Sequence, residues 1–374
     1  MVMTKVIKVD PSRPNEELIK EAAEVIRRGG LVAFPTETVY GLGADAFNRS
    51  AVLKIFKVKG RPPDNPLIVH ICRFNQLYEL AMEVPDRVIS VVKKFWPGPL
   101  TVILRKSSKV INEVTASLPT VAIRMPAHPI ALKLIEYSST PIAAPSANLS
   151  GRPSPTTPQH VINDLMGLID VIIDGGETLF GVESTIIDMT HDPPRLLRPG
   201  PLTIEEVERV LGGEVVIPPF ARGLMESDKA LSPGVKYRHY APKARMVLVE
   251  LSSYEDLRPL IMKVRELALM YVNEGLRVGI LCSDETISYY KDIRALSLSL
   301  GPRSNQFIIA KNLFKTLRAF DDEGVDIIVA EGFEERGLGL TIMNRLRKAS
   351  GYNIVKVDVG NLAICTRRNH IQAQ

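Results

Sequence analysis

The stretch from Phe34 to His70 constrains the fold of this chain most strongly. It begins with an apolar strand that runs into a threonine-rich turn, FPTETVYGLG, and continues through a helix into the turn KGRPPDNP and a second apolar strand. The helix that ends at Lys59 is stopped by Gly60 and by the prolines that follow Arg61, because proline cannot continue a helix. Apolar strands that alternate with helices and end in polar turns predict an α/β domain with ligand-binding groups beyond the strands.

Similar segments recur through the first two-thirds of the chain. A helix is predicted over residues 15–28, and a second starts around Asn48-Arg49-Ser50, with Ser50 as its N-cap. Further strands are predicted at 31–34, 67–72, 100–104, 120–124, 142–144, 171–174, 184–188 and 195–197, and further helices at 85–95, 129–137, 158–167 and 203–211. Short strands mixed irregularly with helices favour a twisted, mixed sheet.

The pattern changes near Val216. Residues 216–244, which include SPGVKYRHYAP, have no clear periodicity, and loops of this length are usually functional lids or linkers. Beyond them, strands at 246–251, 277–282 and 326–331 alternate with helices at 256–274 and 306–323, which predicts a small Rossmann-like parallel sheet. We therefore predict a first domain over 1–215, a linker over 216–244, a second domain over 245–360 and a tail over 361–374.

The composition is typical of a globular protein without a membrane span. A chain of 374 residues exceeds one ordinary core, and 45% hydrophobic with 24% charged residues is usual for soluble proteins. The absence of a long apolar run or signal segment predicts a cytoplasmic location. The widely spaced Cys72, Cys282 and Cys365 favour reduced thiols. A net charge of +5 is compatible with an anionic ligand, but it is too small to indicate nucleic acid by itself.

Several polar residues next to buried strands are candidate ligand contacts. Lys59 and Arg61 could only be opposing the dipole of their helix, but a forked donor beside a point charge also suits adjacent phosphates, and the sequence leaves both interpretations open. Thr36 could satisfy its own turn, and His70 could be an ordinary core histidine. Arg124 ends an apolar strand, so a carboxylate from the protein or from a ligand should meet its guanidinium.

Other loops carry similar groups. Ser146 and Asn148 in PSANLSG could bind phosphate or ribose, or could simply form a turn. GVEST and LLRPG, which contain Ser184 and Arg198, also place polar groups beside buried strands. Together these loops supply convergent donors around one sheet, as an anion-binding site requires.

The motifs that are missing narrow the chemistry. The chain has no P-loop, zinc-ligand spacing or serine-hydrolase elbow, and no metal site is predicted. GLGADA fits the dinucleotide pattern only superficially, because the helix starts several residues too late for a pyrophosphate to rest on that turn.

At this point the motifs resemble those of a known family, the long form of threonylcarbamoyl-AMP synthase. The matching segments, in the order of that family, are FPTETVYGLG, KVKGRPPDNPLIVHI, WPGPLT, VAIRMPAHP, APSANLSG, GVESTIID and LLRPG, followed by SPGVKYRHYAP and GLGLTIMNRLRKAS. The resemblance implies a YrdC-like catalytic domain followed by a smaller Rossmann-like domain.

The resemblance also implies a reaction. L-threonine, bicarbonate or carbon dioxide, and ATP would give threonylcarbamoyl-AMP and pyrophosphate for threonylcarbamoyladenosine in tRNA, with Mg²⁺ accompanying ATP. A separate transferase complex would use the product, so direct tRNA binding and a membrane are not expected. The residues implied for threonine are Thr36, His70, Arg124 and Ser184. Those implied for ATP are Lys59, Arg61, Asn65, Thr120, Ser146, Asn148, Arg198 and Tyr240, with Lys59 and Arg61 in the catalytic role.

Two other interpretations use the same residues differently. A basic concave face could bind double-stranded RNA or tRNA, although only 6% of the residues are aromatic and the cations are interleaved with apolar strands. The second domain could instead be a docking module. Its Asn344-Arg345-Leu-Arg-Lys348 run is interpreted here as a solvated helix face.

Overall fold

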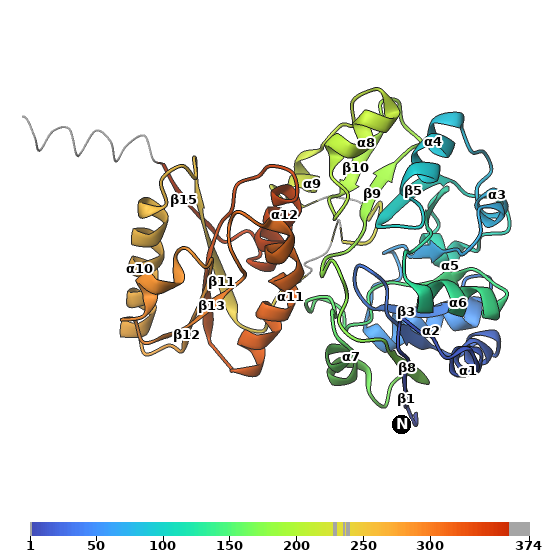
Figure 1. The fold of residues 1–374 in the computed structure, drawn as a ribbon, viewed down its shortest axis with the longest axis horizontal. Coiled ribbons are helices and arrows are strands. Elements are labelled where there is room, and N and C mark those ends of the chain that lie inside the picture. The colour runs from blue at the N-terminus through green and yellow to red at the C-terminus, as the bar shows by residue number, and fades with distance from the viewer. Residues whose placement is uncertain (1, 227–229, 235, 237–239, 359–374) are drawn as a thin grey trace, which may run out of the picture. The chain divides into compact units, whose positions relative to one another are not determined.

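The computed structural model describes residues 2–226, 230–234, 236 and 240–358. It divides into two compact units with the boundary between His239 and Tyr240 (Figure 1). Four residues of the predicted linker motif (Val235, Tyr237, Arg238 and His239), the predicted tail and Cys365 lie outside the described residues. Within the described residues, no helix is long and apolar enough to cross a membrane.

The first unit is built on a ten-stranded sheet with the order β1-β8-β2-β3-β7-β4-β6-β5-β9-β10. Parallel and antiparallel neighbours alternate irregularly along it, which confirms the predicted mixed sheet. The strands are β1 (Lys5–Lys8), β2 (Val32–Phe34), β3 (Gly41–Asp45), β4 (Ile68–His70), β5 (Leu100–Arg105), β6 (Thr120–Arg124), β7 (Ile142–Ala143), β8 (Val171–Asp174), β9 (Thr185–Asp188) and β10 (Arg195–Arg198).

Helices pack against this sheet and against each other. They are α1 (Glu16–Arg27), α2 (Arg49–Lys59), α3 (Asn75–Leu80), α4 (Asp86–Phe95), α5 (Asn112–Thr115), α6 (Pro129–Ser138), α7 (Pro158–Leu165), α8 (Ile204–Leu211) and α9 (Pro219–Arg222). Helices α1 and α6 lie side by side (Figure 1) and bury an apolar cluster against β2 and β8. The periodic apolar face of α1, which includes Ile19 and Ile26, explains this packing.

Two local predictions for the first unit were wrong. Helix α2 begins after Asn48, whose side-chain oxygen accepts a hydrogen bond from the backbone N–H of Ala51, and not after Ser50. Residues 41–45 form the strand β3, which pairs antiparallel with β2, and not a continuation of the turn. Position 43 requires glycine, because a Cβ there would lie 2.8 Å from the Phe34 ring and from Ile142.

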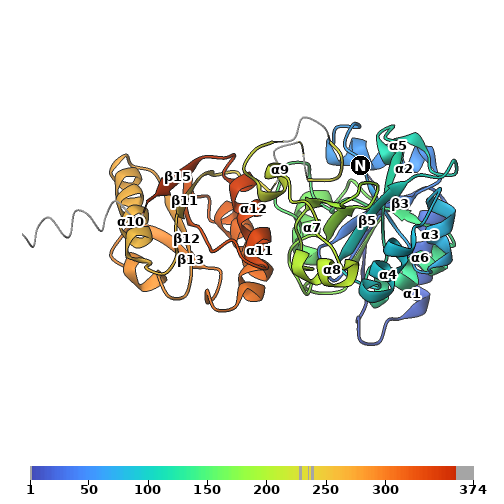
Figure 2. The ribbon, with the colours of Figure 1, turned by 90° about the horizontal axis from the view of Figure 1, so that it is seen from above.

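The second unit is a five-stranded, all-parallel sheet with the order β13-β12-β14-β11-β15, as the strand–helix alternation predicted. Helix α10 covers one face, and α11 and α12 cover the other (Figures 1 and 2). The elements are β11 (Arg245–Leu251), α10 (Arg258–Asn273), β12 (Val278–Cys282), a 3₁₀ turn (Ile287–Tyr290), β13 (Ala295–Ser299), α11 (Gln306–Asp322), β14 (Ile327–Glu331), α12 (Gly339–Ala349) and β15 (Ile354–Val357).

The Asn344–Lys348 run belongs to α12, and the interpretation of this run as a solvated face was wrong. Every residue of the run is buried, including Arg345, which has no exposed surface. The guanidinium of Arg345 lies over the ring of Tyr240, 5.0 Å from its centroid. The charged side chains of this run therefore contact other residues of the protein and not solvent.

Candidate active site

A row of buried polar side chains crosses five neighbouring strands of the first unit. His70, Arg124 and Thr101 are register partners on β4, β6 and β5, so their side chains lie next to one another on one face of the sheet. Ser184 precedes β9, and its hydroxyl lies 2.8 Å from that of Thr101. Arg198 ends β10 and donates hydrogen bonds to the hydroxyl and the carbonyl of Ser184. We call these five residues the polar row.

Arg124 is met by a protein carboxylate, one of the two partners that the sequence allowed. Its Nη2 lies 2.6 Å from Oε1 of Glu37, and both side chains are 4% exposed. Nη1 donates to the hydroxyl of Thr38 at 3.0 Å and Nε donates to the carbonyl of Gly98 at 3.3 Å. The turn after β2 therefore reaches the polar row and neutralises its central charge.

Two histidines near this pair are held in the neutral form. Burial, followed by the positive charge of Arg124, lowers the pKa of His70 to about 3. Burial also lowers the pKa of His128 to about 4, against the opposing effect of the Glu37 carboxylate. At neutral pH both imidazoles are uncharged, and each can donate from one ring nitrogen and accept at the other.

Thr36 and Thr38 organise the turn that carries Glu37. Their hydroxyls lie 2.8 Å apart, and the Thr36 hydroxyl donates to the carbonyl of Val39 while it accepts from the backbone N–H groups of Thr38 and Val39. This is the turn-satisfying role that the sequence left open for Thr36. The same hydroxyl network places Thr38 on Arg124, so Thr36 stands next to the polar row.

A second polar cluster lies around Lys59 and the loop after β7. The buried ammonium of Lys59 donates to the carbonyls of Ser146 and Asn148, and the guanidinium of Arg61 donates to the carbonyls of Asn65 and Pro66. Ser146 pairs with Gly41 of β3, which ties this loop to the threonine turn. The helix end and the loop are thus held together by cations, as a phosphate-binding cluster requires.

Two predicted nucleotide contacts have other neighbours in the structure. Thr120 is at the opposite end of β6 from Arg124, where it pairs with Arg105 of β5. Tyr240 belongs to the second unit, where its ring stacks on Phe314 at a centroid distance of 5.2 Å. Their roles in nucleotide binding stay predictions.

The described part of the linker packs over the same face of the sheet as the polar row. Phe220 of α9 and Leu231 pack on a cluster formed by Ile68, Ile103, Ala122, Ile186 and Leu197. Arg198 donates to the carbonyl of Pro233, and Lys236 forms an ion pair of 3.1 Å with Asp64 in the turn after α2. This segment therefore closes over the face that carries the candidate site.

Unfilled hydrogen-bonding capacity marks the site. Within the described ranges, several buried side-chain atoms of the first unit make no hydrogen bond: both carboxylate oxygens of Glu37, Nη2 of Arg124, Nδ1 of His70, Nδ1 of His128, Oδ1 of Asn65 and Oδ1 of Asn148. Buried polar atoms normally have partners, so a concentration of unpaired ones indicates a place where a ligand supplies them.

The sequence prediction assigned no binding role to four residues of this site. Thr101 and His128 were not candidates, and Glu37 and Thr38 were noted only as neighbours of Thr36 in the turn that follows a buried strand. A signal was present for Glu37: Arg124 required a carboxylate, and Glu37 follows the buried strand β2 by three residues. Thr101 could not be found without the strand register.

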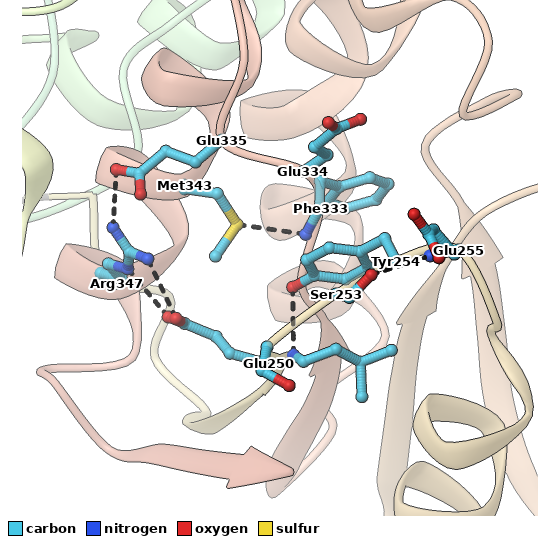
Figure 3. A pocket seen from close by; sticks show the side chains of 11 residues that line it. Glu250, Ser253, Tyr254, Glu255, Phe333, Glu334, Glu335, Met343 and Arg347 are labelled. Carbon is cyan, nitrogen blue, oxygen red and sulfur yellow. Dashed lines mark hydrogen bonds and ion pairs between the residues drawn. The ribbon is translucent and has the colours of Figure 1, made fainter. Parts of the chain in front are cut away.

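A cavity of about 420 Å³ in the second unit is chemically different. It lies beyond β11 and β14 and is lined by Glu250, Tyr254, Phe333, Glu335, Met343 and Arg347, among others (Figure 3). Arg347 pairs with both oxygens of Glu250, at 2.8 and 2.9 Å, and with Glu335 at 3.0 Å. The buried charges that line this cavity therefore already have protein partners.

The described residues contain no group of three or more histidine, cysteine, aspartate or glutamate side chains arranged to hold a metal ion. The four cations singled out from the sequence, Lys59, Arg61, Arg124 and Arg198, are at most 7% exposed. A nucleic-acid duplex cannot reach buried cations, so these residues do not form the basic surface that the RNA-binding interpretation requires.

Two family models match the chain. Residues 24–200 match the model for Sua5, YciO and YrdC proteins, described as telomere recombination, and residues 202–351 match the threonylcarbamoyl-AMP synthase C-terminal domain. A threonylcarbamoyl-AMP synthase from Pyrococcus abyssi is 54% identical over 95% of this chain and 100% of its own length. The chain belongs to the threonylcarbamoyl-AMP synthase family. The resemblance seen in the motifs is thereby confirmed, and with it an AMP-forming, nucleotidyltransferase-type enzyme of tRNA modification.

Other relatives agree over nearly the whole chain. A threonylcarbamoyl-AMP synthase from Bacillus subtilis is 47% identical over 93% of this chain and 97% of its own. The crystal structure of P. abyssi Sua5 complexed with L-threonine superposes with a TM-score of 0.87 at 53% identity, covering 94% of this chain and 99% of that one. The predicted combination of a YrdC-like domain and a smaller parallel-sheet domain is confirmed.

Proposed function

We propose that this threonylcarbamoyl-AMP synthase condenses L-threonine, bicarbonate or carbon dioxide, and ATP into threonylcarbamoyl-AMP and pyrophosphate. The observation that carries the proposal is the polar row with its unfilled hydrogen-bonding atoms, next to a cluster of buried cations. The complex of the P. abyssi relative with L-threonine supports the choice of amino acid.

In this proposal threonine occupies the polar row. Arg124 binds its carboxylate, because a guanidinium has five N–H donors and the hydrogen bonds to Thr38 and Gly98 use two of them. Thr36, Ser184 and the neutral ring of His70 supply groups that can donate to or accept from the substrate hydroxyl and amine. All four residues are buried, which keeps the polar contacts out of competition with water.

ATP occupies the neighbouring cluster. Lys59 and Arg61 bind phosphate oxygens, and Arg198 joins the two substrates because it already contacts Ser184. The remaining proposed nucleotide contacts are Asn65, Thr120, Ser146, Asn148 and Tyr240. The free amide oxygens of Asn65 and Asn148 suit the N–H or hydroxyl donors of a nucleoside, because an amide oxygen only accepts.

The chemistry needs position and charge more than a protein nucleophile. The neutral threonine amine attacks carbon dioxide and loses a proton, or attacks bicarbonate with loss of water, to give a carbamate. A carbamate oxygen then attacks the α-phosphorus as pyrophosphate leaves. Phosphoryl transfer of this kind is accelerated mainly by alignment and by cations that stabilise the departing charge, here Lys59 and Arg61. Mg²⁺ would enter with ATP, held mostly by phosphate oxygens and water.

The linker acts as a lid in this proposal. Phe220 and Leu231 cover the apolar part of the site face, and Pro233 contacts Arg198. The product is a mixed anhydride that water can hydrolyse, so a covered site protects it until it passes to the transferase complex that modifies tRNA. Direct tRNA binding by this chain is not part of the reaction.

The direct test is pyrophosphate release from ATP by the purified chain in bicarbonate buffer with Mg²⁺. We expect release only when both L-threonine and bicarbonate are present. Release without threonine would identify a nucleotide-cleaving enzyme with another substrate. Absence of release from correctly folded protein would contradict the proposal.

A further inference from the structure

Glu37 makes an ion pair that is close but incomplete. Its carboxylate is buried and lies 2.6 Å from Arg124, yet this contact lacks the geometry of a hydrogen bond. A carboxylate can accept about four hydrogen bonds, and neither oxygen of Glu37 accepts one from the part of the chain that the structure describes. Burying a pair of charges is compensated only when their remaining hydrogen-bonding capacity is also filled. The pair therefore lacks a donor on the glutamate side.

The groups around Glu37 limit what that donor can be. Nη1 and Nε of Arg124 donate to Thr38 and Gly98, and the contact with Glu37 is made by Nη2. His128 lies close enough to be influenced by the carboxylate, but its pKa of about 4 leaves it neutral. No second protein cation balances Glu37 among the described residues. The missing partner is therefore a donor that arrives with the ligand.

An α-amino acid has the complementary charge pattern. Its carboxylate and its ammonium group are joined through one carbon, and Arg124 and Glu37 present the opposite charges side by side. A substrate whose carboxylate binds Arg124 would bring its ammonium group, with three N–H donors, to the unfilled oxygens of Glu37. The carboxylate oxygens of Glu37, which accept no hydrogen bond from the described residues, then gain donors, and the substrate carboxylate shares the guanidinium of Arg124 with Glu37.

We infer that Glu37 is a specificity-determining residue that recognises the α-ammonium group of the amino-acid substrate. The inference rests on the proposed function, since it requires the substrate carboxylate to bind Arg124. It assigns to Glu37 the selection of an amino acid over a hydroxy acid of the same shape. Wrong ligands are rejected because they would leave a buried carboxylate unpaired.

The test compares L-threonine with (R)-3-hydroxybutyrate, which is L-threonine without its amino group, by titration calorimetry at neutral pH. The wild-type chain should bind L-threonine at least about tenfold more tightly. Glu37→Gln should weaken L-threonine binding by about 10- to 100-fold, as expected for loss of a charged hydrogen bond, and should leave the affinity for 3-hydroxybutyrate equal or better. The KM for threonine should rise while the KM for ATP stays unchanged.

Glu331→Gln is the matched control. It alters a second buried glutamate that is paired with an arginine, at 2.7 Å, in the other unit, and it should leave both affinities unchanged. If Glu37→Gln weakens both ligands equally, Glu37 merely orients Arg124 and the inference is wrong. Equal binding of both ligands by the wild type overturns it without any variant, even if Glu37→Gln does not fold. Failure of the wild type to bind threonine would instead contradict the proposed function.

Discussion

Among the buried glutamate–arginine pairs of the described residues, Glu37–Arg124 and Glu331–Arg303 differ in what surrounds them. In the second unit, both oxygens of Glu331 are used: Tyr290 donates to one at 2.6 Å, and Arg303 at 2.7 Å and Ser283 at 3.4 Å donate to the other. The guanidinium of Arg303 also lies 4.5 Å from the centroid of the Phe333 ring. In the first unit, Glu37 has its arginine and no hydrogen bond from the described residues.

The difference separates a structural pair from a functional one. Charge type, pairing distance and burial are similar in the two places, so none of these properties identifies a site. Hydrogen-bonding capacity that the protein leaves unfilled does identify it, because a fold with only structural needs would fill it. In our proposal the unfilled oxygens of Glu37 bind a ligand, whereas both oxygens of Glu331 already accept hydrogen bonds within the second unit.

The largest effect is expected from a substitution that lowers turnover in the first unit without unfolding it. Lys59→Met removes a buried cation from the proposed phosphate cluster, and turnover should fall about 100- to 1,000-fold, as for loss of one charge-stabilising donor. Steady-state pyrophosphate release measures it. Lys57→Met, an exposed lysine in the same last turn of α2, is the control and should stay near the wild-type rate. Turnover of Lys59→Met within threefold of the wild type would remove Lys59 from the site.

The next effect compares the stability of the two pairs directly. Replacing both Arg303 and Glu331 by Met leaves the buried Tyr290 hydroxyl without its acceptor, and should lower the free energy of unfolding by about 1–3 kcal/mol. The matched double variant, with Met at positions 37 and 124, removes an incompletely satisfied pair and should change stability by no more than about 1 kcal/mol.

Urea denaturation of both double variants measures these changes. Fluorescence and far-ultraviolet dichroism should be followed together, so that the two units are distinguished if they unfold separately. A larger loss of stability in the first-unit variant than in the second-unit variant would reverse the comparison.

Lowering the pH should reduce the stability of the first unit, because His70 is buried beside Arg124. Its pKa is about 3 in the folded chain and near its ordinary value of 6.5 in the unfolded chain. Its stability contribution is therefore complete above pH 6.5 and is lost as the pH falls from 6.5 towards 3, by about 1.4 kcal/mol per pH unit. His70→Gln should reduce the slope of unfolding free energy against pH by that amount between pH 6 and pH 4.

The smallest expected effect concerns the lid. Lys236→Ala removes the 3.1 Å ion pair between the linker and Asp64, which lies near Arg61 in the sequence. The side chains of Lys236 and Asp64 are both partly exposed. Exposed pairs contribute at most about 1 kcal/mol, so product yield should fall no more than about fivefold. Yield is measured as intact threonylcarbamoyl-AMP per pyrophosphate released. An unchanged ratio would show that this tether does not protect the product.

The sequence predicted the parts of this architecture that depend on local patterns. Apolar runs and helix punctuation located most strands and helices, including the stop at Gly60, which has a left-handed backbone with φ of 61°. Strand β3 was missed because glycines are poor strand formers. In the structure, the side chains of Phe34 and Ile142 occupy the space that a Cβ at Gly43 would need. Strands β13 and β15 of the second unit were missed.

The site was only partly predictable for a physical reason. Motif residues could be named individually, and Arg124 was recognised as needing a carboxylate. The register that brings His70, Arg124 and Thr101 together comes from long-range pairing, which no local pattern contains. The burial of the Asn344–Lys348 run likewise depends on tertiary contacts, so its charges suggested a surface that the fold does not have.

The measurement that tests the central claim most directly is the shift in unfolding temperature that L-threonine produces. A ligand at 100 times its dissociation constant stabilises the folded chain by about 2.7 kcal/mol. L-threonine should therefore raise the unfolding temperature of the wild type and of Glu331→Gln equally, and should not raise that of Arg124→Met relative to its own ligand-free value. An equal rise for Arg124→Met would show that the amino acid binds elsewhere and that the unfilled polar row is not its site.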